Sequence, residues 1–313
     1  MNITGFPLID GDARRGIAPA VPRHWGVCTI YVLIAQTVLG VMWSIVDALA
    51  FTTGAGGAQY AALASIGWLI IPFGALALTT TWLSEETDNR GWAALGVSRQ
   101  TLPGAAPWVL AGLVAASPVL LDIAALAPSW IATAASALLA LLPATLIQSG
   151  AEEVFFRGAL LAMLIAQYGP KNGVIISALL FGFWHVGVGQ SPLDLTINVS
   201  MTFVFGITSA ILVLHQGHIG GAIALHFVWN FVGNVDAGLT NFAGQEDWSV
   251  DDFWMSFDAS FDTSWTEEEF LDPDTRNTLL MPLLLETLLI VGICRDTIFR
   301  VFAPARSEPD VSA

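Results

Sequence analysis

The chain has 313 residues, of which 55% are hydrophobic and only 12% are charged, and its mean hydropathy is +0.67. This composition excludes an ordinary soluble domain and is typical of a protein that lies in a membrane. The formal net charge of −15 argues against a nucleic-acid partner, because nucleic acids select basic surfaces. We therefore expect membrane lipid around the chain and no bound nucleic acid.

Apolar runs recur along the whole sequence. Crossing about 30 Å of hydrocarbon takes roughly 20 helical residues, and about eight runs reach or approach that length. They predict an all-α fold, a polytopic transmembrane helix bundle. In chain order the expected spans are 25–51, 59–83, 108–127, 130–167, 173–189, 195–214, 219–239 and 279–294.

The fourth run is longer than one crossing and contains Pro143. A proline inside a helix removes one backbone hydrogen bond and clashes with the preceding turn. The sequence therefore predicts a kink or an in-plane segment near Pro143.

The basic residues predict the orientation, because Lys and Arg are retained on the cytoplasmic side of a membrane. With an even number of spans, every basic residue outside the spans except Arg276 falls on the same side of the membrane. Both termini are therefore expected in the cytoplasm. One lysine against ten arginines indicates a GC-rich genome, and hence a prokaryotic plasma membrane. The residues on that side are Arg14, Arg15, Arg23, Arg90, Arg99, Lys171, Arg295, Arg300 and Arg306.

The chain is expected to form one transmembrane domain, 25–302, between a cytoplasmic N-terminal segment, 1–24, and a cytoplasmic tail, 303–313. An acidic loop, 240–278, interrupts the domain on the extracytoplasmic side. Trp and Phe residues alternate with the acidic residues there, which predicts a partly folded cap or one seated at the membrane interface. We assign this loop no chemistry.

The stretch GAEEVFFRGALL, residues 150–161, places three charges within an apolar run. Ionisable side chains are costly at the bilayer centre unless they pair or line water, so each indicates a function. Glu153 and Arg157 are four residues apart and predict an ion pair on one helix face, while Glu152 is turned about 100° away as a free carboxylate. A purely structural network of the three charges is the alternative.

Two later stretches add imidazole and amide groups. LLFGFWHVG places His185 in the fifth span, and ALHFVWNFVGN places His226 and Asn230 on one face of the seventh. A lone histidine in an apolar helix is more often a hydrogen-bonded core residue than a catalyst. Two histidines, an asparagine and a free glutamate on three helices together indicate a polar intramembrane active-site pocket. Weaker candidates that line water are Asn198, Asn234 and Asp236.

These residue types suit amide hydrolysis inside a membrane. Glutamate with histidine can activate a water, and a second histidine with an asparagine can donate hydrogen bonds to the developing oxyanion. Glu152, His185 and His226 could instead hold zinc with water as the fourth ligand, although no H-E-x-x-H motif is present. We favour no cofactor, because the remaining carboxylate, Glu153, is committed to Arg157 and cannot support a ligating imidazole.

Together the motifs resemble those of a known family. EEVFFR resembles its E-E-x-x-x-R, FGFWH its F-x-x-x-H, and HFVWN its H-x-x-x-N, in the same order and on separate helices. This is the CAAX protease and bacteriocin-processing (Abi) family of intramembrane endopeptidases, which includes the type II CAAX prenyl endopeptidases. The resemblance covers residues 108–239, which hold the core motifs.

The resemblance implies a role for each matched residue. Glu152 would activate the water with His185, while His226 and Asn230 would stabilise the oxyanion. Glu153 and Arg157 would support and orient Glu152. The family has been classed both as metalloproteases and as glutamate proteases, so the resemblance leaves zinc open.

The family also implies a peptide or protein substrate at the cytoplasmic side of the membrane. Eukaryotic relatives remove the last three residues of prenylated proteins, and some prokaryotic members are linked to bacteriocin maturation or self-immunity. The main alternative function is a non-catalytic membrane scaffold or bacteriocin self-immunity protein on the same fold. A proton-coupled transporter is disfavoured, because the sequence has no inverted repeat and no matched pair of broken helices.

Overall fold

The computed structural model describes residues 25–52, 58–88, 95–97, 99–125, 130–186, 191–239, 249–260 and 273–303. Expectations for 1–24, for 304–313 and for the loop segments 240–248 and 261–272 lie outside the described residues. All of the regular structure in the described part of the chain is helical. The predicted all-α fold is therefore confirmed.

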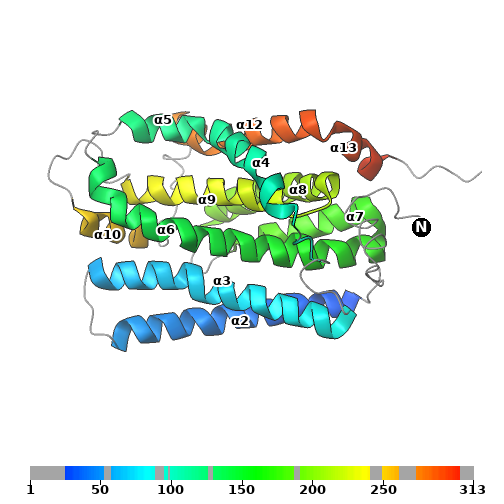
Figure 1. The fold of residues 1–313 in the computed structure, drawn as a ribbon, viewed down its shortest axis with the longest axis horizontal. Coiled ribbons are helices and arrows are strands. Elements are labelled where there is room, and N and C mark those ends of the chain that lie inside the picture. Colours follow the sequence, from blue (N-terminus) through cyan, green and yellow to red (C-terminus); the bar gives the residue numbers. More distant parts are fainter. Residues whose placement is uncertain are drawn as a thin grey trace, which may run out of the picture.

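The helices lie side by side along the longest axis of the molecule (Figure 1). One edge of the bundle is formed by α2 (Trp25–Thr52) and α3 (Ala58–Asp88). The opposite edge is formed by α4 (Thr101–Ala115), α5 (Ser117–Ala125), α12 (Pro273–Ile293) and α13 (Arg295–Phe302). Between them lie α6 (Trp130–Glu153), η1 (Val154–Leu160), α7 (Leu161–Trp184), α8 (Pro192–Gln216) and α9 (Gly220–Leu239).

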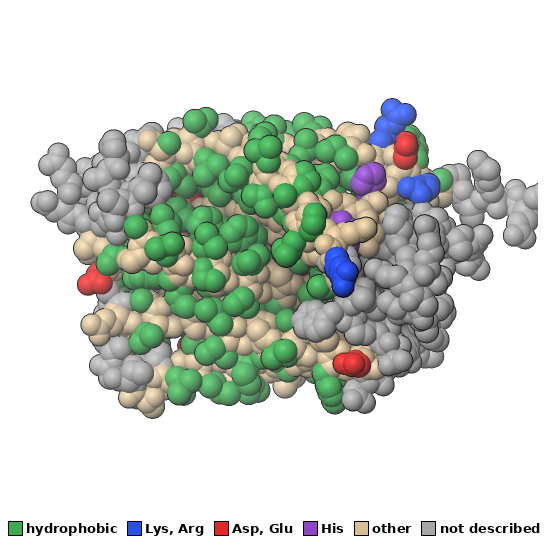
Figure 2. Space-filling model, viewed as in Figure 1, with side chains coloured by type: hydrophobic (Ala, Val, Ile, Leu, Met, Phe, Trp, Pro, Cys, Tyr) green, Lys and Arg blue, Asp and Glu red, His purple; other side chains and the backbone are tan. Residues whose placement is uncertain are grey.

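The side of the bundle is covered by apolar side chains, and the charged ones gather at its two ends (Figure 2). Among the described residues, four helical stretches are long and apolar enough to cross a membrane. They are Gly26–Leu49, Gln59–Glu85, Ala134–Trp184 and Leu195–Gln216. The apolar side and charged ends agree with a membrane location, while the count of eight spans stays a prediction.

The third expected span is divided into two short helices. α4 ends at Ala115, and α5 begins at Ser117, directly before Pro118. Proline has no N–H to donate to the carbonyl four residues before it and its ring clashes with that carbonyl, which accounts for a break at Ala116. The apolar run 108–127 therefore does not form one continuous helix.

The fourth expected span departs from α-helical geometry later than predicted. α6 continues through Pro143 as a helix as far as Glu153, and the following seven residues, η1, form a π-helix. A π-helix has i→i+5 hydrogen bonds and more residues per turn than an α-helix, and such segments occur mostly at functional sites. The irregular turn thus lies directly after the glutamate pair.

The fourth and fifth expected spans are joined by a tight turn within α7. Gly169 has φ 80° and ψ 168°, a conformation that side chains disfavour, and Pro170 follows it. After the turn the chain packs back on itself, since a Cβ at Gly173 would lie 2.8 Å from the Ile165 nitrogen. The turn brings the second half of α7 against the bundle centre.

The second half of α7 packs closely on α8. A Cβ at Gly206 of α8 would lie 2.9 Å from the Ala178 Cα of α7, so only glycine allows this approach. Small residues are typical of tight helix contacts in membranes. The close contact holds the end of α7, and with it His185, in a fixed place.

Within the described part of the acidic loop, α10 (Val250–Ser260) packs on α3, α6 and α9. Ser249 and Asp252 cap it reciprocally, because the Ser249 backbone N–H donates to Asp252 Oδ2 at 2.8 Å and the Asp252 N–H donates to Ser249 Oγ at 3.3 Å. Hydrogen bonds from the Ser249 hydroxyl and then its N–H lower the pKa of Asp252. Phe253 and Trp254 of this helix are buried.

Candidate active site

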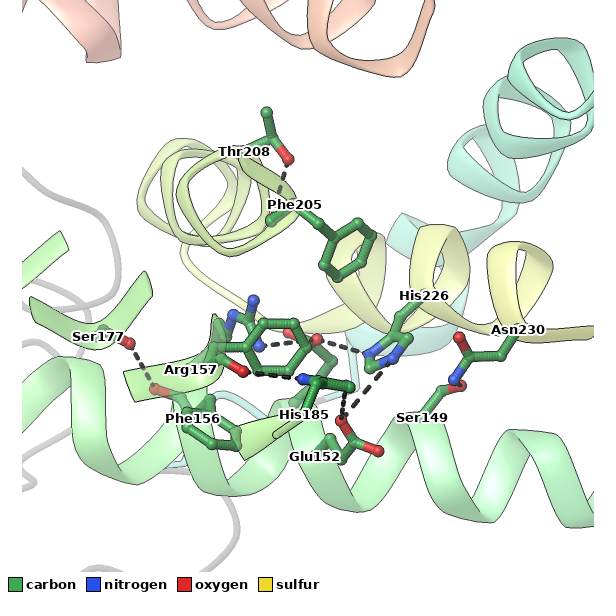
Figure 3. A network of polar contacts seen from close by, with 12 residues as sticks. Ser149, Glu152, Phe156, Arg157, Ser177, His185, Phe205, Thr208, His226 and Asn230 are labelled. Carbon is green, nitrogen blue, oxygen red and sulfur yellow. Dashed lines mark hydrogen bonds and ion pairs between the residues drawn. The ribbon is translucent and has the colours of Figure 1, made fainter. Parts of the chain in front are cut away.

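The residues singled out from the sequence come together in the centre of the bundle (Figure 3). Glu152 and Glu153 are the last residues of α6, and Arg157 lies in η1. His226 and Asn230 are one turn apart on α9, which packs against α6. Segments far apart in sequence therefore supply the carboxylates and their nitrogen partners.

His185 reaches this cluster from a helix end. The sequence predicted a helix to residue 189, but α7 ends at Trp184 and His185 is its C-cap. His185 Nδ1 lies 2.8 Å from the Phe181 carbonyl oxygen. Since a carbonyl can only accept, Nδ1 carries the proton and donates it, and Nε2 of the neutral ring is an acceptor. The helix end fixes both the place and the tautomer of His185.

One carboxylate oxygen lies between the two imidazoles. Glu152 Oε2 is 3.9 Å from His185 Nε2 and 3.9 Å from His226 Nε2. Glu152 is 2% exposed, and its Oε2 has no hydrogen-bond partner among the described residues. A separation of 3.9 Å is too long for a direct hydrogen bond, but it suits a water that bonds to both atoms at about 2.8 Å.

Glu153 connects α6, η1 and α9. Its Oε1 lies 3.1 Å from Arg157 Nη1 and 2.8 Å from His226 Nδ1. The geometry contains the predicted ion pair with Arg157, while the contact with His226 was not foreseen. A carboxylate that accepts the Nδ1 proton fixes the ring orientation, so that Nε2 faces Glu152. Glu153 therefore positions His226 as well as balancing the charge of Arg157.

Arg157 is enclosed by aromatic rings. Its side chain is 1% exposed, and its guanidinium carbon lies 4.1 Å from the centroid of the Phe181 ring. Phe156 of η1 packs edge-to-face on Phe181, with centroids 5.0 Å apart. The contact with Glu153 is an ion pair without hydrogen-bond alignment, because none of the guanidinium nitrogens has an aligned partner in the described chain. Exclusion of water strengthens this ion pair and the cation–π contact.

Asn230 lies beside His226, with its amide directed toward α6 (Figure 3). Its Nδ2 donates to Ser149 Oγ at 3.5 Å. Ser149 is fully buried, whereas Asn230 is partly exposed. The amide therefore contacts α6, and the residue as a whole is not fully buried.

One buried carboxylate near the cluster was missed from the sequence. Glu286 of α12 is 2% exposed and accepts a hydrogen bond from Thr208 of α8 at 3.4 Å. It is close enough to Glu153 and Arg157 for their charges to interact. The stretch LLLETLLI carried the signal, since a charge inside an apolar span indicates a paired or functional group. Glu286 thus adds a buried carboxyl group from a distant part of the chain to the surroundings of Arg157.

The three alternative zinc ligands are spaced too widely for zinc as they stand. Tetrahedral zinc separates its ligand atoms by roughly 3.3 Å, against 3.9 Å from Glu152 Oε2 to either Nε2. No metal-binding group of three His, Cys, Asp or Glu side chains occurs within the described part of the chain. Yet both imidazoles have the supporting contacts that zinc ligands use, namely Glu153 for His226 and the Phe181 carbonyl for His185. The expected shortage of such partners was wrong, and the spacing alone disfavours zinc.

The comparison with protein families gives one match to this region. Residues 133–232 match the family described as type II CAAX prenyl endopeptidase Rce1-like. This segment is thus similar to the CAAX protease-like family, which supports the resemblance found in the motifs. The comparisons with curated proteins and with solved structures gave no match.

The CAAX protease-like segment contains every residue that the motifs singled out, from Glu152 to Asn230. It also contains Ser149, while Glu286 and the helices α2 and α3 lie outside it. The family and the long apolar helices together identify an integral membrane protein.

Proposed function

We propose that this protein is an intramembrane endopeptidase that hydrolyses peptide bonds of membrane-associated or lipid-modified substrates. The observation that supports this most strongly is the convergence of two imidazole Nε2 atoms on Glu152 Oε2, each at 3.9 Å, inside an apolar bundle. A carboxylate and an imidazole that share a water can supply the nucleophile for amide hydrolysis.

In the proposed reaction Glu152 is the general base. The His185 Nε2 lone pair accepts one hydrogen of the water, and Glu152 accepts the other as a proton while the water oxygen bonds to the scissile carbonyl carbon. The protonated Glu152 then gives that proton to the leaving nitrogen as the C–N bond breaks. The products are a carboxylic acid and an amine, which become a carboxylate and an ammonium when the acid's proton passes to the amine, and Glu152 returns to its starting state.

His226 and Asn230 are the proposed donors to the oxyanion. Asn230 Nδ2 has a second hydrogen beyond the one that it gives to Ser149. His226 gives its Nδ1 proton to Glu153, so donation from Nε2 requires a ring that carries both protons. The Glu153 carboxylate is placed to balance that charge. Each such donor contributes about 10²- to 10³-fold to the rate in comparable sites.

The family match favours a prenylated substrate, whose lipid would stay in the bilayer while the peptide enters the site. A test uses the purified protein in liposomes and an eight-residue peptide with farnesylcysteine fourth from its C-terminus. We expect cleavage after the cysteine. The value of kcat/KM should be at least about tenfold higher than for the same peptide without the farnesyl group, because the farnesyl group concentrates the peptide at the membrane. Equal values would contradict prenyl recognition and leave a general membrane peptidase.

We propose that the protein lies in a prokaryotic plasma membrane with both termini in the cytoplasm. The start of α2 and α13, which packs on α7, lie at one end of the bundle, whereas α10 lies at the other (Figure 1). In a variant without the buried Cys28 and Cys294, Lys171→Cys should react with an impermeant thiol reagent only from the cytoplasm. Asp251→Cys should react only from outside, and the reverse pattern would contradict this orientation.

We propose further that the reaction needs no metal, because the 3.9 Å spacing suits a bound water better than zinc. Elemental analysis of active protein should show well under one zinc per chain, and activity should survive a strong chelator. Stoichiometric zinc whose removal abolishes activity, and whose return restores it, would contradict the metal-free reaction.

A further inference from the structure

A second amide–hydroxyl pair repeats the one at Asn230. Asn234 Nδ2 donates to Thr145 Oγ1 at 3.2 Å, one helical turn beyond the contact from Asn230 Nδ2 to Ser149 Oγ at 3.5 Å. In both pairs the asparagine comes from α9 and the hydroxyl from α6. The polar contact between the two helices therefore continues beyond the candidate active site.

The two pairs share one pattern of burial. Thr145 and Ser149 are fully buried, while Asn230 and Asn234 are partly exposed. Each hydroxyl therefore binds the amide of an asparagine that is only partly buried. An amide group has two N–H donors and an acceptor oxygen, so one contact to a hydroxyl leaves capacity for a ligand.

The spacing of the two amides matches an extended peptide. Residues four apart on a helix are separated by about 6 Å along its axis. In an extended strand, carbonyl groups two residues apart point the same way and are about 6.7 Å apart. A peptide whose scissile carbonyl lies at Asn230 therefore presents its next carbonyl on the same side to Asn234.

We propose that Asn234, held by Thr145, binds the backbone carbonyl two residues from the scissile bond, so that the substrate lies extended along α9. This subsite rests on the proposed peptidase function. It recognises backbone rather than side chains, and so fixes the position of a peptide without restricting its sequence.

A purely structural reading of the same contact predicts a different result. Interhelical hydrogen bonds also join helices in membranes, so loss of Asn234 could simply loosen α6 from α9. Such a loss would weaken the binding of all peptides by the same factor. A binding subsite instead predicts that the effect depends on one backbone carbonyl of the substrate.

The experiment is a double-substitution cycle, in which one change is made in the protein and the other in the backbone of the substrate. Binding is measured by fluorescence polarisation in the Glu152→Gln background, which prevents turnover, with the farnesylated peptide as the probe. Two further probes carry an ester, whose carbonyl is a weaker acceptor, in place of the peptide bond two residues before or two residues after the scissile bond. Asn234→Ala and the similarly sized Asn234→Leu are compared with Asn172→Ala, which removes an exposed asparagine from α7.

We expect one of the two esters to weaken binding roughly 3- to 10-fold when Asn234 is present, and to have no effect in Asn234→Ala and Asn234→Leu. Asn172→Ala should keep the full ester effect. Equal ester effects with and without Asn234, or no binding of any probe, would overturn the subsite. If the coupling is found but the protein with Glu152 cleaves no peptide, the subsite stands and the proposed peptidase function fails.

Discussion

Replacing Glu152 with glutamine should lower kcat for the farnesylated peptide by about 10²- to 10⁴-fold. Glutamine keeps the size of the side chain but cannot accept the proton of the water, so the reaction loses its base. Glu152 Oε2 has no direct hydrogen-bond partner to lose in the described chain, so the yield and melting temperature of the protein should change little. The measurement compares single-turnover cleavage rates of the two proteins in liposomes.

The control for this substitution is Glu85→Gln, which removes an exposed carboxylate from α3. It should leave the cleavage rate unchanged. If Glu152→Gln cleaves as fast as the unaltered protein, Glu152 is not the base. If neither protein cleaves any peptide, the scaffold or self-immunity alternative gains support.

The second large effect concerns stability. Glu153→Gln should lower the free energy of unfolding by about 3–5 kcal/mol, because it leaves the buried Arg157 without its nearest counter-charge. It also weakens the acceptor that orients His226, so activity should fall as well. The free energy can be followed by denaturant titration in detergent micelles.

A double variant distinguishes the contribution of the ion pair to stability from a general disruption of the core. Glu153→Gln combined with Arg157→Met should lose less stability than the sum of the single substitutions, since neither charge of the pair is then left alone. If Glu153→Gln is as stable as the unaltered protein, Arg157 does not depend on Glu153. Strictly additive losses would show that the pair makes no specific contribution.

Most helix boundaries could be predicted from the sequence because they follow from apolar length. The first expected span, 25–51, corresponds to α2 (Trp25–Thr52), and the seventh, 219–239, to α9 (Gly220–Leu239). Polar or glycine-containing segments bound both runs, and an apolar helix of this length has few alternatives in lipid. The local composition therefore decides these elements without reference to the rest of the fold.

The interruptions were harder to predict. The break before Pro118 had a local signal, which the length of the apolar run 108–127 concealed. The π-helix of η1 has no compositional signal, because its seven residues would also suit an α-helix. The end of α7 at Trp184 depends on how the chain packs after the turn at Gly169.

The candidate site was predictable in its members but not in its contacts. Spacing alone pairs Glu153 with Arg157, because residues four apart on a predicted helix share one face. The contact of Glu153 with His226 joins residues 73 positions apart, and only the packing of α6 on α9 brings them together. This contact changes the argument about zinc, because it gives His226 the supporting carboxylate that the sequence analysis did not foresee.

The most direct test of the central proposal follows the oxygen atom of the water. The farnesylated peptide is cleaved in a single turnover in water enriched in ¹⁸O, and the product that ends in cysteine is analysed by mass spectrometry. Attack by a water activated by Glu152 predicts one ¹⁸O atom in the new carboxylate, formed about 10²- to 10⁴-fold more slowly with Glu152→Gln. An intact peptide with the unaltered protein, or labelled product formed at the same rate by both proteins, would contradict the proposal that Glu152 activates water for peptide hydrolysis.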